Sequence, residues 1–411
     1  MNYIFIDTKD GIEKVGIVEN HKLVEFYIDY QNKSQLVGNI YRGRVKNVLQ
    51  GMEAAFVDIG DDKNAYLDLK NAVFSNLKLN KEMNIRDIVK VGQEVIVQVL
   101  KEPTENKGAK VTTNITLPGR FIVLTPFSEK ISVSRKIQDE KEVNRLKNIG
   151  EKIIEDNMGM IFRTNSQGVS EDLLKKEYFE LVHIYKRIER EKNFLPCPKL
   201  IYKEMNLSER VIRDSYSERI DKIIVNDRGK YNSLIELEDI FFPSLKEKLY
   251  YDEDFDINYE ESIVSGLRSA LNRKVPLKSG GYIVIDETEA LTVIDVNTGK
   301  FIGSKSLEDT VVKTNLEAAE EIARQIRLRN LTGIIIIDFI DMKDNKNVAL
   351  ITERLEEHLN YDKNKANIVD ITKLGLVELT RRKTRNSLSN YFAKTCPTCN
   401  GKGKLYKLVD K

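Results

Sequence analysis

The chain has 411 residues, enough for two or three domains, and its 66 Lys and Arg residues nearly balance its 64 Asp and Glu residues. Net charge therefore gives no sign of a nucleic-acid partner, and any RNA-binding surface must come from local patches. The apolar runs are shorter than a membrane span, the N-terminus lacks signal-peptide features and three cysteines make no disulfide framework, so we expect a cytoplasmic protein without a membrane segment.

The first 35 residues are typical of two or three short strands. The runs YIFID, KVGIVE and KLVEFYID are separated by Asp-Gly and Asn-His pairs that favour turns. Three strands alone make a poor domain, so we expect them to pair with a sheet elsewhere in the chain.

Residues 36–116 predict a small antiparallel β-barrel. GNIYRGRVKNVLQGMEAAFVDIGDDKNAYLDL and VKVGQEVIVQVLKE are short alternating runs punctuated by glycine. Aromatic residues interleave with basic ones, a combination that suits single-stranded nucleic acid, where bases stack and cations follow the backbone. The candidate residues are Tyr41, Phe56, Tyr66, Arg42, Arg44, Lys46 and Lys107. The alternative is that the aromatic side chains fill the barrel core.

Residues 117–205 predict the strands FIVLTP and GMIFRT, followed by an amphipathic helix that begins near Ser170. Arg163 and Thr164 stand at the end of an apolar strand, before a polar turn. A guanidinium, a hydroxyl and loop amides together suit a phosphate group, although a solvated strand end is the simpler reading. The three histidines lack convincing partners, so we exclude general-base histidine chemistry.

Two apolar runs further along the chain each end in acidic residues. LTVIDVN carries Asp295 and Asn297, and GIIIIDFID carries Asp338 and Asp341. The β-branched run 334–337 predicts a strand buried on both faces. The helical pattern between the two runs has Arg324 and Arg327 on its solvated side. It makes a βαβ unit, which brings the ends of two parallel strands to one edge.

Alternation places Asp295 and Asn297 on one face, so neighbouring strands would bring them together with Asp338. Oxygen ligands with open positions suit Mg²⁺. The alternative is that these acidic side chains cap strand ends or pair with arginine.

The C-terminal part contains a predicted helix, KNVALITERLEEHL, and NKANIVDITKLGLVELTRRKTR, which predicts a strand followed by a helical stretch. Its basic run either contacts phosphate beside the acidic residues or is a solvated face. This run contains Arg381, Arg382, Lys383 and Arg385.

CPTCNGKG places Cys396 and Cys399 in a C-x-x-C spacing, but structural zinc needs four ligands. The remaining cysteine, Cys197, has no second partner. The simplest complete site takes two thiolates from each of two chains, which predicts a homodimer closed by a shared Zn²⁺. A redox pair or an inert turn is the alternative.

The strings TEALTVIDVNTGKF, NLEAAEEIARQIRLRNLTGIIIIDFIDM and CPTCNGKG, in this order, resemble the ribonuclease E/G family, and the resemblance covers nearly the whole chain. It implies an α/β and α+β multidomain protein with a DNase I-like catalytic domain. The implied parts are an RNase H-like subdomain (1–35 and 206–272), an OB-fold RNA-binding domain (36–116), a 5′-sensor region (117–205), the catalytic domain (273–390) and a zinc-link with a C-terminal tail (391–411).

The resemblance implies an Mg²⁺-dependent endoribonuclease of RNA processing and decay. It would cut single-stranded RNA, favour 5′-monophosphorylated substrates and leave 5′-phosphate and 3′-hydroxyl ends. Asp295 and Asp338 would hold Mg²⁺, with Asn297 orienting Asp295. The other implied contacts are the 5′-phosphate with Arg163, Thr164 and Val123, and RNA with Phe56, Tyr66 and Lys107; Tyr66 stands where the best-known member has Phe.

By the same resemblance, CPTC is the zinc-link of a homodimer. Because the chain ends at Lys411, we do not expect the C-terminal domain of longer members or their dimer-of-dimers assembly. Two rival functions stay open: a non-catalytic RNA-binding or ribosome-associated protein with a degenerate nuclease fold, and a nuclease acting on DNA.

Overall fold

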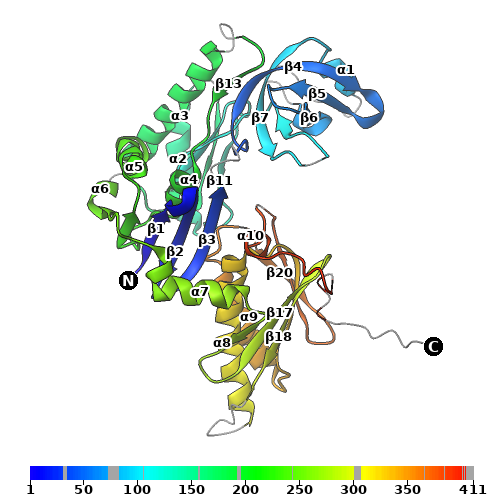
Figure 1. Cartoon of the computed structure of the whole chain (residues 1–411). Helices are drawn as coiled ribbons and strands as arrows, with labels where there is room; N and C mark the ends of the chain where they lie inside the picture. Colours follow the sequence, from blue (N-terminus) through cyan, green and yellow to red (C-terminus); the bar gives the residue numbers. More distant parts are fainter. Residues whose placement is uncertain are drawn as a thin grey trace, which may run out of the picture. The chain divides into compact units, whose positions relative to one another are not determined.

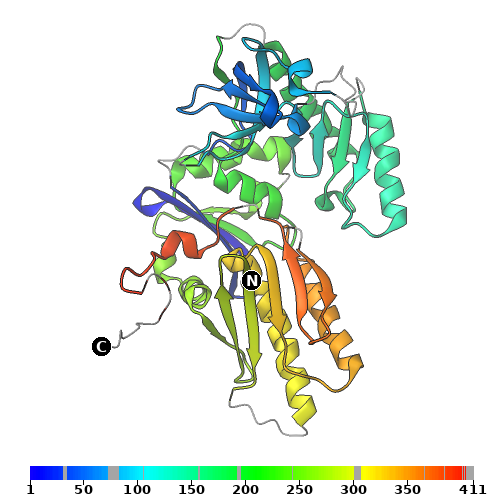
Figure 2. The ribbon, with the colours of Figure 1, turned by 90° about the vertical axis from the view of Figure 1, so that its right-hand side faces the viewer.

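The computed structural model shows a mixed α/β protein with two compact units (Figures 1 and 2). The first unit contains Met1–Tyr30, Ser217–Tyr231 and Lys248–Lys411, and the second contains Gln31–Tyr216 and Asn232–Glu247. The structure describes residues 1–30, 35–72, 83–104, 106–155, 158–191, 196–242, 244–299, 307–364, 366–383, 385–399, 401 and 403. None of the helices in these ranges has the length and apolar character needed to cross a membrane.

The N-terminal strands join a later part of the chain in a five-stranded sheet of the first unit, with the order β15-β14-β1-β2-β3. The predicted strands are confirmed, and β1 runs parallel to β14 and antiparallel to β2. The strands are β1 (Tyr3–Asp7), β2 (Ile12–Glu19), β3 (Lys22–Tyr30), β14 (Lys222–Val225) and β15 (Leu249–Tyr251). Phe5, Phe26 and Phe255 are buried in the core beside this sheet.

A six-stranded sheet, with the order β16-β17-β18-β19-β21-β20, is the second sheet of the first unit. Its strands are β16 (Lys274–Pro276), β17 (Tyr282–Glu287), β18 (Leu291–Asn297), β19 (Gly333–Asp338), β20 (Ala366–Ile371) and β21 (Val377–Arg381). Helices α8 (Leu307–Arg329) and α9 (Asn345–Leu359) pack on it, and α7 (Glu261–Leu271) and α10 (Ser389–Phe392) belong to the same unit. The predicted βαβ unit is confirmed, because β18 and β19 are parallel neighbours joined through α8.

The prediction that residues 334–337 are buried on both faces is wrong. Ile335 and Ile337 are fully buried, whereas Ile334 is 48% exposed and Ile336 is half-buried. The reason is that α8 and α9 cover one face of the sheet, so the side chains that alternate to the other face stay accessible. We call this accessible side the open face of the sheet.

Two further expectations for this unit need correction. The segment after residue 376 is not helical: β20 and β21 form an antiparallel hairpin, and Gly375 turns the chain with φ +84°. Arg327, expected on the solvated side of its helix, is buried and pairs with Glu25 of β3 at 2.7 Å. A second face of α8 therefore packs against the N-terminal sheet.

The predicted small barrel is confirmed in the second unit, but it is not wholly antiparallel, because β6 and β8 run parallel. Strands β4, β5, β6, β8 and β7 pair in that order and β7 returns to β4, which closes a five-stranded barrel that β13 extends. The elements are β4 (Ile40–Leu49), β5 (Ala54–Asp58), β6 (Ala65–Asp68), α1 (Ile85–Ile88), β7 (Glu94–Lys101), β8 (Lys110–Thr112) and β13 (Lys199–Tyr202). Residues 73–82 lie outside the described residues.

A four-stranded sheet with the order β11-β12-β10-β9 completes the second unit's β-structure. Its strands are β9 (Leu117–Pro118), β10 (Ile122–Thr125), β11 (Ile131–Val133) and β12 (Gly159–Phe162). The helices of this part of the chain are α2 (Glu140–Ile153), α3 (Glu171–Glu191), α4 (Leu207–Ser215), α5 (Arg228–Phe241) and α6 (Leu245–Lys248). The predicted amphipathic helix is α3, which buries Leu174, Tyr178, Leu181, Tyr185 and Ile188.

Candidate active site and RNA-binding surfaces

The acidic residues of the two parallel strands face each other on the open face of the sheet. The register of β18 and β19 places Asp295 directly opposite Asp338 at their carboxyl ends. The amide Nδ2 of Asn297 donates a hydrogen bond of 2.7 Å to Oδ2 of Asp295. The structure thus brings together the three residues that the sequence singled out.

Negative charge accumulates at this edge. Partial desolvation of its carboxyl raises the pKa of Asp338, and the neighbouring charges of Asp295 and Asp341 raise it further. Within the described ranges, none of Asp295, Asp338 and Asp341 forms an ion pair with Lys or Arg. Asp295 interacts with the Arg273 charge only beyond ion-pair distance. Accessible carboxylate oxygens that form no ion pair fit Mg²⁺, which takes one or two protein carboxylates and keeps several waters. No three Asp, Glu, His or Cys residues of the described chain converge as a closed metal cluster.

Asn315 of α8 holds the loop that directly follows Asp338 at the end of β19 and carries Asp341. Its side chain is fully buried, its Nδ2 donates to the carbonyl of Ile340 at 2.8 Å, and its Oδ1 accepts from the N–H of Ile340 at 3.1 Å. No motif in the sequence singles out this residue. The available signal was an amide at a position that shares a helical stripe with Ala319, Ile322 and Ile326.

The barrel presents one aromatic pair at its surface. Phe56 and Tyr66 are cross-strand neighbours on β5 and β6, both half-buried, with ring centroids 6.0 Å apart and an interplanar angle of 67°. Tyr41, by contrast, belongs to the barrel core, so for this residue the alternative prediction, that the aromatic side chains fill the core, is correct. Lys107 is exposed on a turn just before Ala109, whose carbonyl accepts from the N–H of Tyr66.

The other basic candidates on the barrel are already paired. Arg42 and Arg44 both contact Glu94, and Lys46 lies 3.2 Å from Asp58. These ion pairs reduce the positive charge that the sequence pattern indicated. Lys107 forms no ion pair within the described ranges.

The Arg-Thr pair lies where β12 ends. Arg163 donates to the carbonyl of Gly119 at 2.6 Å and to Asp214 at 2.7 Å, so its guanidinium is fixed from two sides. The Thr164 hydroxyl is 2.9 Å from the hydroxyl of Ser134. Val123 lies on the adjacent strand β10, opposite Ile161, and alternation puts Val123 on the same face as Arg163.

A buried carboxylate, that of Glu177, anchors the loop beside Arg163. Its only signal in the sequence is an acidic residue in an amphipathic helix. Glu177 is 2% exposed and accepts hydrogen bonds of 2.7, 2.8 and 2.7 Å from the N–H groups of Arg120, Phe121 and Ile122. Burial raises the pKa of Glu177, and these three donors offset part of that cost. The loop carries the Gly119 carbonyl that orients Arg163.

The basic run near the C-terminus does not lie beside the acidic pair. Arg381 pairs with Gly333, at the other end of β19 from Asp338, and its buried guanidinium binds Asp362. Arg385 donates to the carbonyl of Phe26 and stacks on Tyr27. Two of the four basic residues therefore stabilise the fold, and the reading in which the run contacts phosphate beside the acidic residues is wrong.

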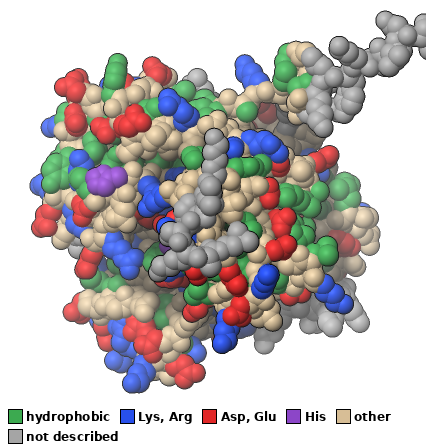
Figure 3. Space-filling model, turned by 90° about the horizontal axis from the view of Figure 1, so that it is seen from below, with side chains coloured by type: hydrophobic (Ala, Val, Ile, Leu, Met, Phe, Trp, Pro, Cys, Tyr) green, Lys and Arg blue, Asp and Glu red, His purple; other side chains and the backbone are tan. Residues whose placement is uncertain are grey.

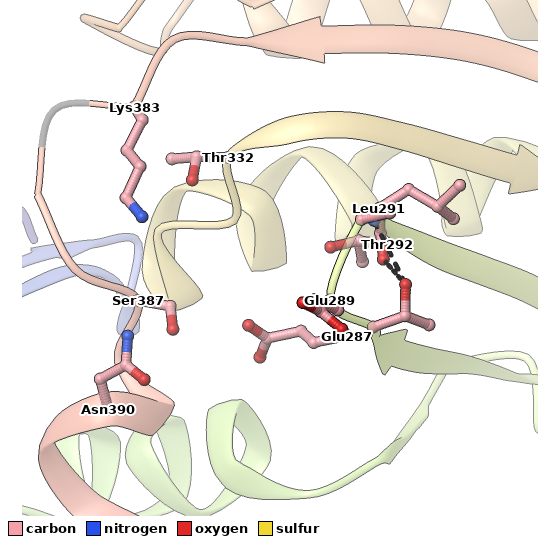
Figure 4. A pocket seen from close by; sticks show the side chains of 10 residues that line it. Glu287, Glu289, Leu291, Thr292, Thr332, Lys383, Ser387 and Asn390 are labelled. Carbon is pink, nitrogen blue, oxygen red and sulfur yellow. Dashed lines mark hydrogen bonds between the residues drawn. The ribbon is translucent and has the colours of Figure 1, made fainter.

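Lys383 lines a polar pocket of about 180 Å³ at that opposite end of the sheet (Figure 4). Glu287 and Glu289 line it from the β17–β18 hairpin, and Ser387 and Asn390 line it from the C-terminal segment. On the face seen in Figure 3, acidic and basic side chains of the described residues are interspersed, without an extended basic surface.

The C-x-x-C element forms a tight turn with both thiols accessible to solvent to some degree. Cys396 is exposed and Cys399 half-buried, and the N–H of Gly403 donates to Sγ of Cys399 at 3.3 Å. Hydrogen bonds from the backbone of Cys399 and Thr398 lower the pKa of the Cys396 thiol, which favours the thiolate that zinc requires. The described part of this chain supplies no third or fourth ligand beside them.

The chain is similar in sequence to a known protein family and to several known proteins over most of its length. The model of the "Ribonuclease E/G family" matches residues 116–384. Ribonuclease G of Haemophilus influenzae is 40% identical over 400 residues, which cover 95% of this chain and 82% of that protein. Ribonuclease G of Escherichia coli (strain K12) is 40% identical over 98% of this chain and 84% of its own length. Ribonuclease E of Nostoc sp. is 36% identical over 96% of this chain, which spans 59% of that protein.

Proposed function

The chain belongs to the ribonuclease E/G family, and from this membership we infer that it is an endoribonuclease of the ribonuclease G type whose substrate is RNA. The observation that carries the assignment to particular residues is the register that sets Asp295 opposite Asp338, with Asn297 bonded to Asp295. We propose that these three residues form the catalytic centre.

Asp295 and Asp338 would hold Mg²⁺, because their carboxylates are accessible, adjacent and free of ion pairs within the described chain. When bound, Mg²⁺ supplies Lewis-acid stabilisation of charge at the phosphodiester and a source of nucleophilic water. Asn297 fixes the orientation of Asp295 through its hydrogen bond. Asn315 holds the loop that directly follows Asp338 in position through its two hydrogen bonds to Ile340. Hydrolysis with departure of the 3′ oxygen leaves 5′-phosphate and 3′-hydroxyl ends.

We also propose that two surfaces of the second unit select the substrate. Phe56 and Tyr66 provide stacking platforms for bases of single-stranded RNA, and Lys107 contacts its backbone. Arg163, Thr164 and Val123 receive a 5′-monophosphate. The guanidinium fixed by Gly119 and Asp214 retains further N–H donors, and a guanidinium fork matches phosphate geometry.

The finer fold assignment is part of the same proposal. The five-stranded barrel (36–116) would be the OB-fold domain, and residues 117–205 the 5′-sensor region. The sheet of β1–β3 with β14 and β15 would be the RNase H-like subdomain (1–35 and 206–272), and the sheet that carries Asp295 the DNase I-like domain (273–390). We place the protein in the cytoplasm, acting on ribosomal and messenger RNA.

Cys396 and Cys399 (391–411) would bind Zn²⁺ together with the same two thiols of a second chain. This proposal is supported by the accessible thiols, the lowered pKa of the Cys396 thiol and the N–H donor to Cys399. The result would be a homodimer.

The Asp295→Asn variant tests the catalytic assignment. We expect it to lose cleavage of a 5′-monophosphorylated single-stranded RNA while its affinity for that RNA stays within about threefold of the parent. Cleavage at the parent rate would remove Asp295 from the mechanism. Absence of cleavage in the parent itself, with RNA binding intact, would favour the non-catalytic RNA-binding function.

A further inference from the structure

A lysine and a tyrosine share the open face of the catalytic sheet with the acidic pair. Cross-strand partners share a face. Lys274 of β16 is opposite Val284, Val284 is opposite Asp295, and Asp295 is opposite Asp338. Lys274 therefore lies in the same cross-strand row as the acidic pair. With strands about 4.8 Å apart, the backbone of Lys274 lies roughly 10 Å from that of Asp295.

Tyr282 holds the Lys274 ammonium in place. Nζ of Lys274 is 3.4 Å from the centre of the Tyr282 ring, a close cation–π contact. Tyr282 is half-buried and lies opposite Asn297, the residue that orients Asp295. The Lys274 side chain is exposed and forms no ion pair with a carboxylate of the described chain. Its charge is thus both oriented and available.

Arg273, the residue before Lys274, is not available to bind phosphate in the same way. Arg273 forms a two-pronged ion pair with Asp286, so its charge is already balanced. RNA that reaches Asp295 and Asp338 brings a row of phosphates to an edge where Asp341 adds further negative charge. A metal at the acidic pair would balance the charge there, and a protein cation can take the place of the counterion at the next phosphate along the strand.

We propose that Lys274, oriented by Tyr282, binds the phosphate of a nucleotide that flanks the scissile bond of single-stranded RNA. The inference rests on the proposed function in one respect, the presence of RNA at Asp295 and Asp338. It predicts that the substrate runs across the open face from β19 toward β16. Lys274 acts here as a point charge for the backbone and gives no base specificity.

The salt dependence of RNA affinity tests this contact. Binding of a 5′-monophosphorylated 10-nucleotide RNA is measured by fluorescence anisotropy between 0.05 and 0.5 M KCl, in the Asp295→Asn chain so that the RNA stays intact. For single strands each phosphate contact contributes about 0.7 to the slope of log K against log salt. We expect Lys274→Ala to reduce the slope by about 0.7 and to weaken binding about fivefold at 0.1 M KCl. Lys274→Arg should keep the parent slope.

Lys222 provides a matched control. Its ammonium lies 5.6 Å from the ring centre of Tyr3, a similar pair on the N-terminal sheet of the same unit, away from the acidic residues. Lys222→Ala should leave the slope unchanged. Tyr282→Leu retains the lysine charge, so we expect it to keep the slope while weakening binding about two- to threefold through lost orientation.

An unchanged slope in Lys274→Ala would overturn the proposal, as would an equal fall in Lys222→Ala, because the effect would then be one of overall charge. The proposed function is judged separately by cleavage in the parent and its loss in Asp295→Asn. If Asp295→Asn still cut RNA, the catalytic assignment would fail, and the slope would then be measured with EDTA in place of Mg²⁺, so that the RNA stays intact and the slope still reports whether Lys274 contacts phosphate.

Discussion

Asn315 offers the sharpest test of how the fold positions the catalytic loop. Replacing it with alanine removes the two hydrogen bonds to Ile340, each worth about 1 kcal/mol, so the protein should lose roughly 2 kcal/mol of stability. The loop that carries Asp341 would then shift and pull on Asp338, the strand residue directly before it, and displacement of a catalytic group by about 1 Å costs on the order of 100-fold in rate. We expect kcat to fall about 10- to 100-fold and the Mg²⁺ concentration for half-maximal rate to rise.

Gln325 is the matched control because it lies on the same helix, is equally buried and also carries an amide. It bonds to Ser269 and Glu321 and accepts from Arg329, so Gln325→Ala should cost at least as much stability. It does not contact the catalytic loop. The assay is cleavage of a quenched fluorescent RNA across a Mg²⁺ titration, with thermal unfolding measured on the same samples. Equal kinetic losses in both variants, or normal Mg²⁺ dependence in Asn315→Ala, would refute a specific role for Asn315.

Three further predictions follow from other sites. Arg163→Gln and Thr164→Val should each reduce the preference for 5′-monophosphate over 5′-hydroxyl RNA at least fivefold in kcat/KM and leave the rate on 5′-hydroxyl RNA nearly unchanged; a preserved preference would exclude the pocket. Burial raises the pKa of Asp214, but Arg213 and Arg163 outweigh it and hold this pKa below the ordinary value. The resulting stability is present above the unfolded pKa of about 3.9 and is lost as pH falls through the folded pKa, so between pH 5 and 3 the Tm should fall more steeply in the parent than in Asp214→Asn. Cys396→Ser should release zinc, measured by a chelator dye, and convert dimer to monomer in light scattering; a variant that keeps both would return CPTC to an inert turn.

Local patterns were enough to predict much of the architecture. Alternation and glycine spacing predicted the barrel strands, and two acid-ended apolar runs around an amphipathic helix predicted the βαβ unit that sets Asp295 opposite Asp338. These features depend on residues near one another in sequence. The acidic pair was predictable because parallel neighbours end at one edge of a sheet.

Long-range packing accounts for the errors. The burial of Arg327 depends on Glu25, which lies on another sheet about 300 residues earlier, and no helical pattern reports that partner. The basic residues at the end of the β20–β21 hairpin are compatible with a helix or a strand, so local pattern predicts a helical stretch there. Pairing of β21 with β19 makes the segment a strand. The roles of Glu177 and Asn315 were not predictable from local sequence, because both side chains bind backbone groups that are distant in the chain.

The central claim is metal-dependent hydrolysis of RNA at the carboxylate pair. Its most direct test is to incubate one short 5′-monophosphorylated single-stranded RNA, and the matched DNA, with the protein in the presence and absence of Mg²⁺ and to analyse the product ends. We predict Mg²⁺-dependent cuts in the RNA alone, with 5′-phosphate and 3′-hydroxyl ends, and none with Asp295→Asn. Cyclic-phosphate ends, cleavage without a divalent metal, or equal cleavage of the DNA would contradict the account.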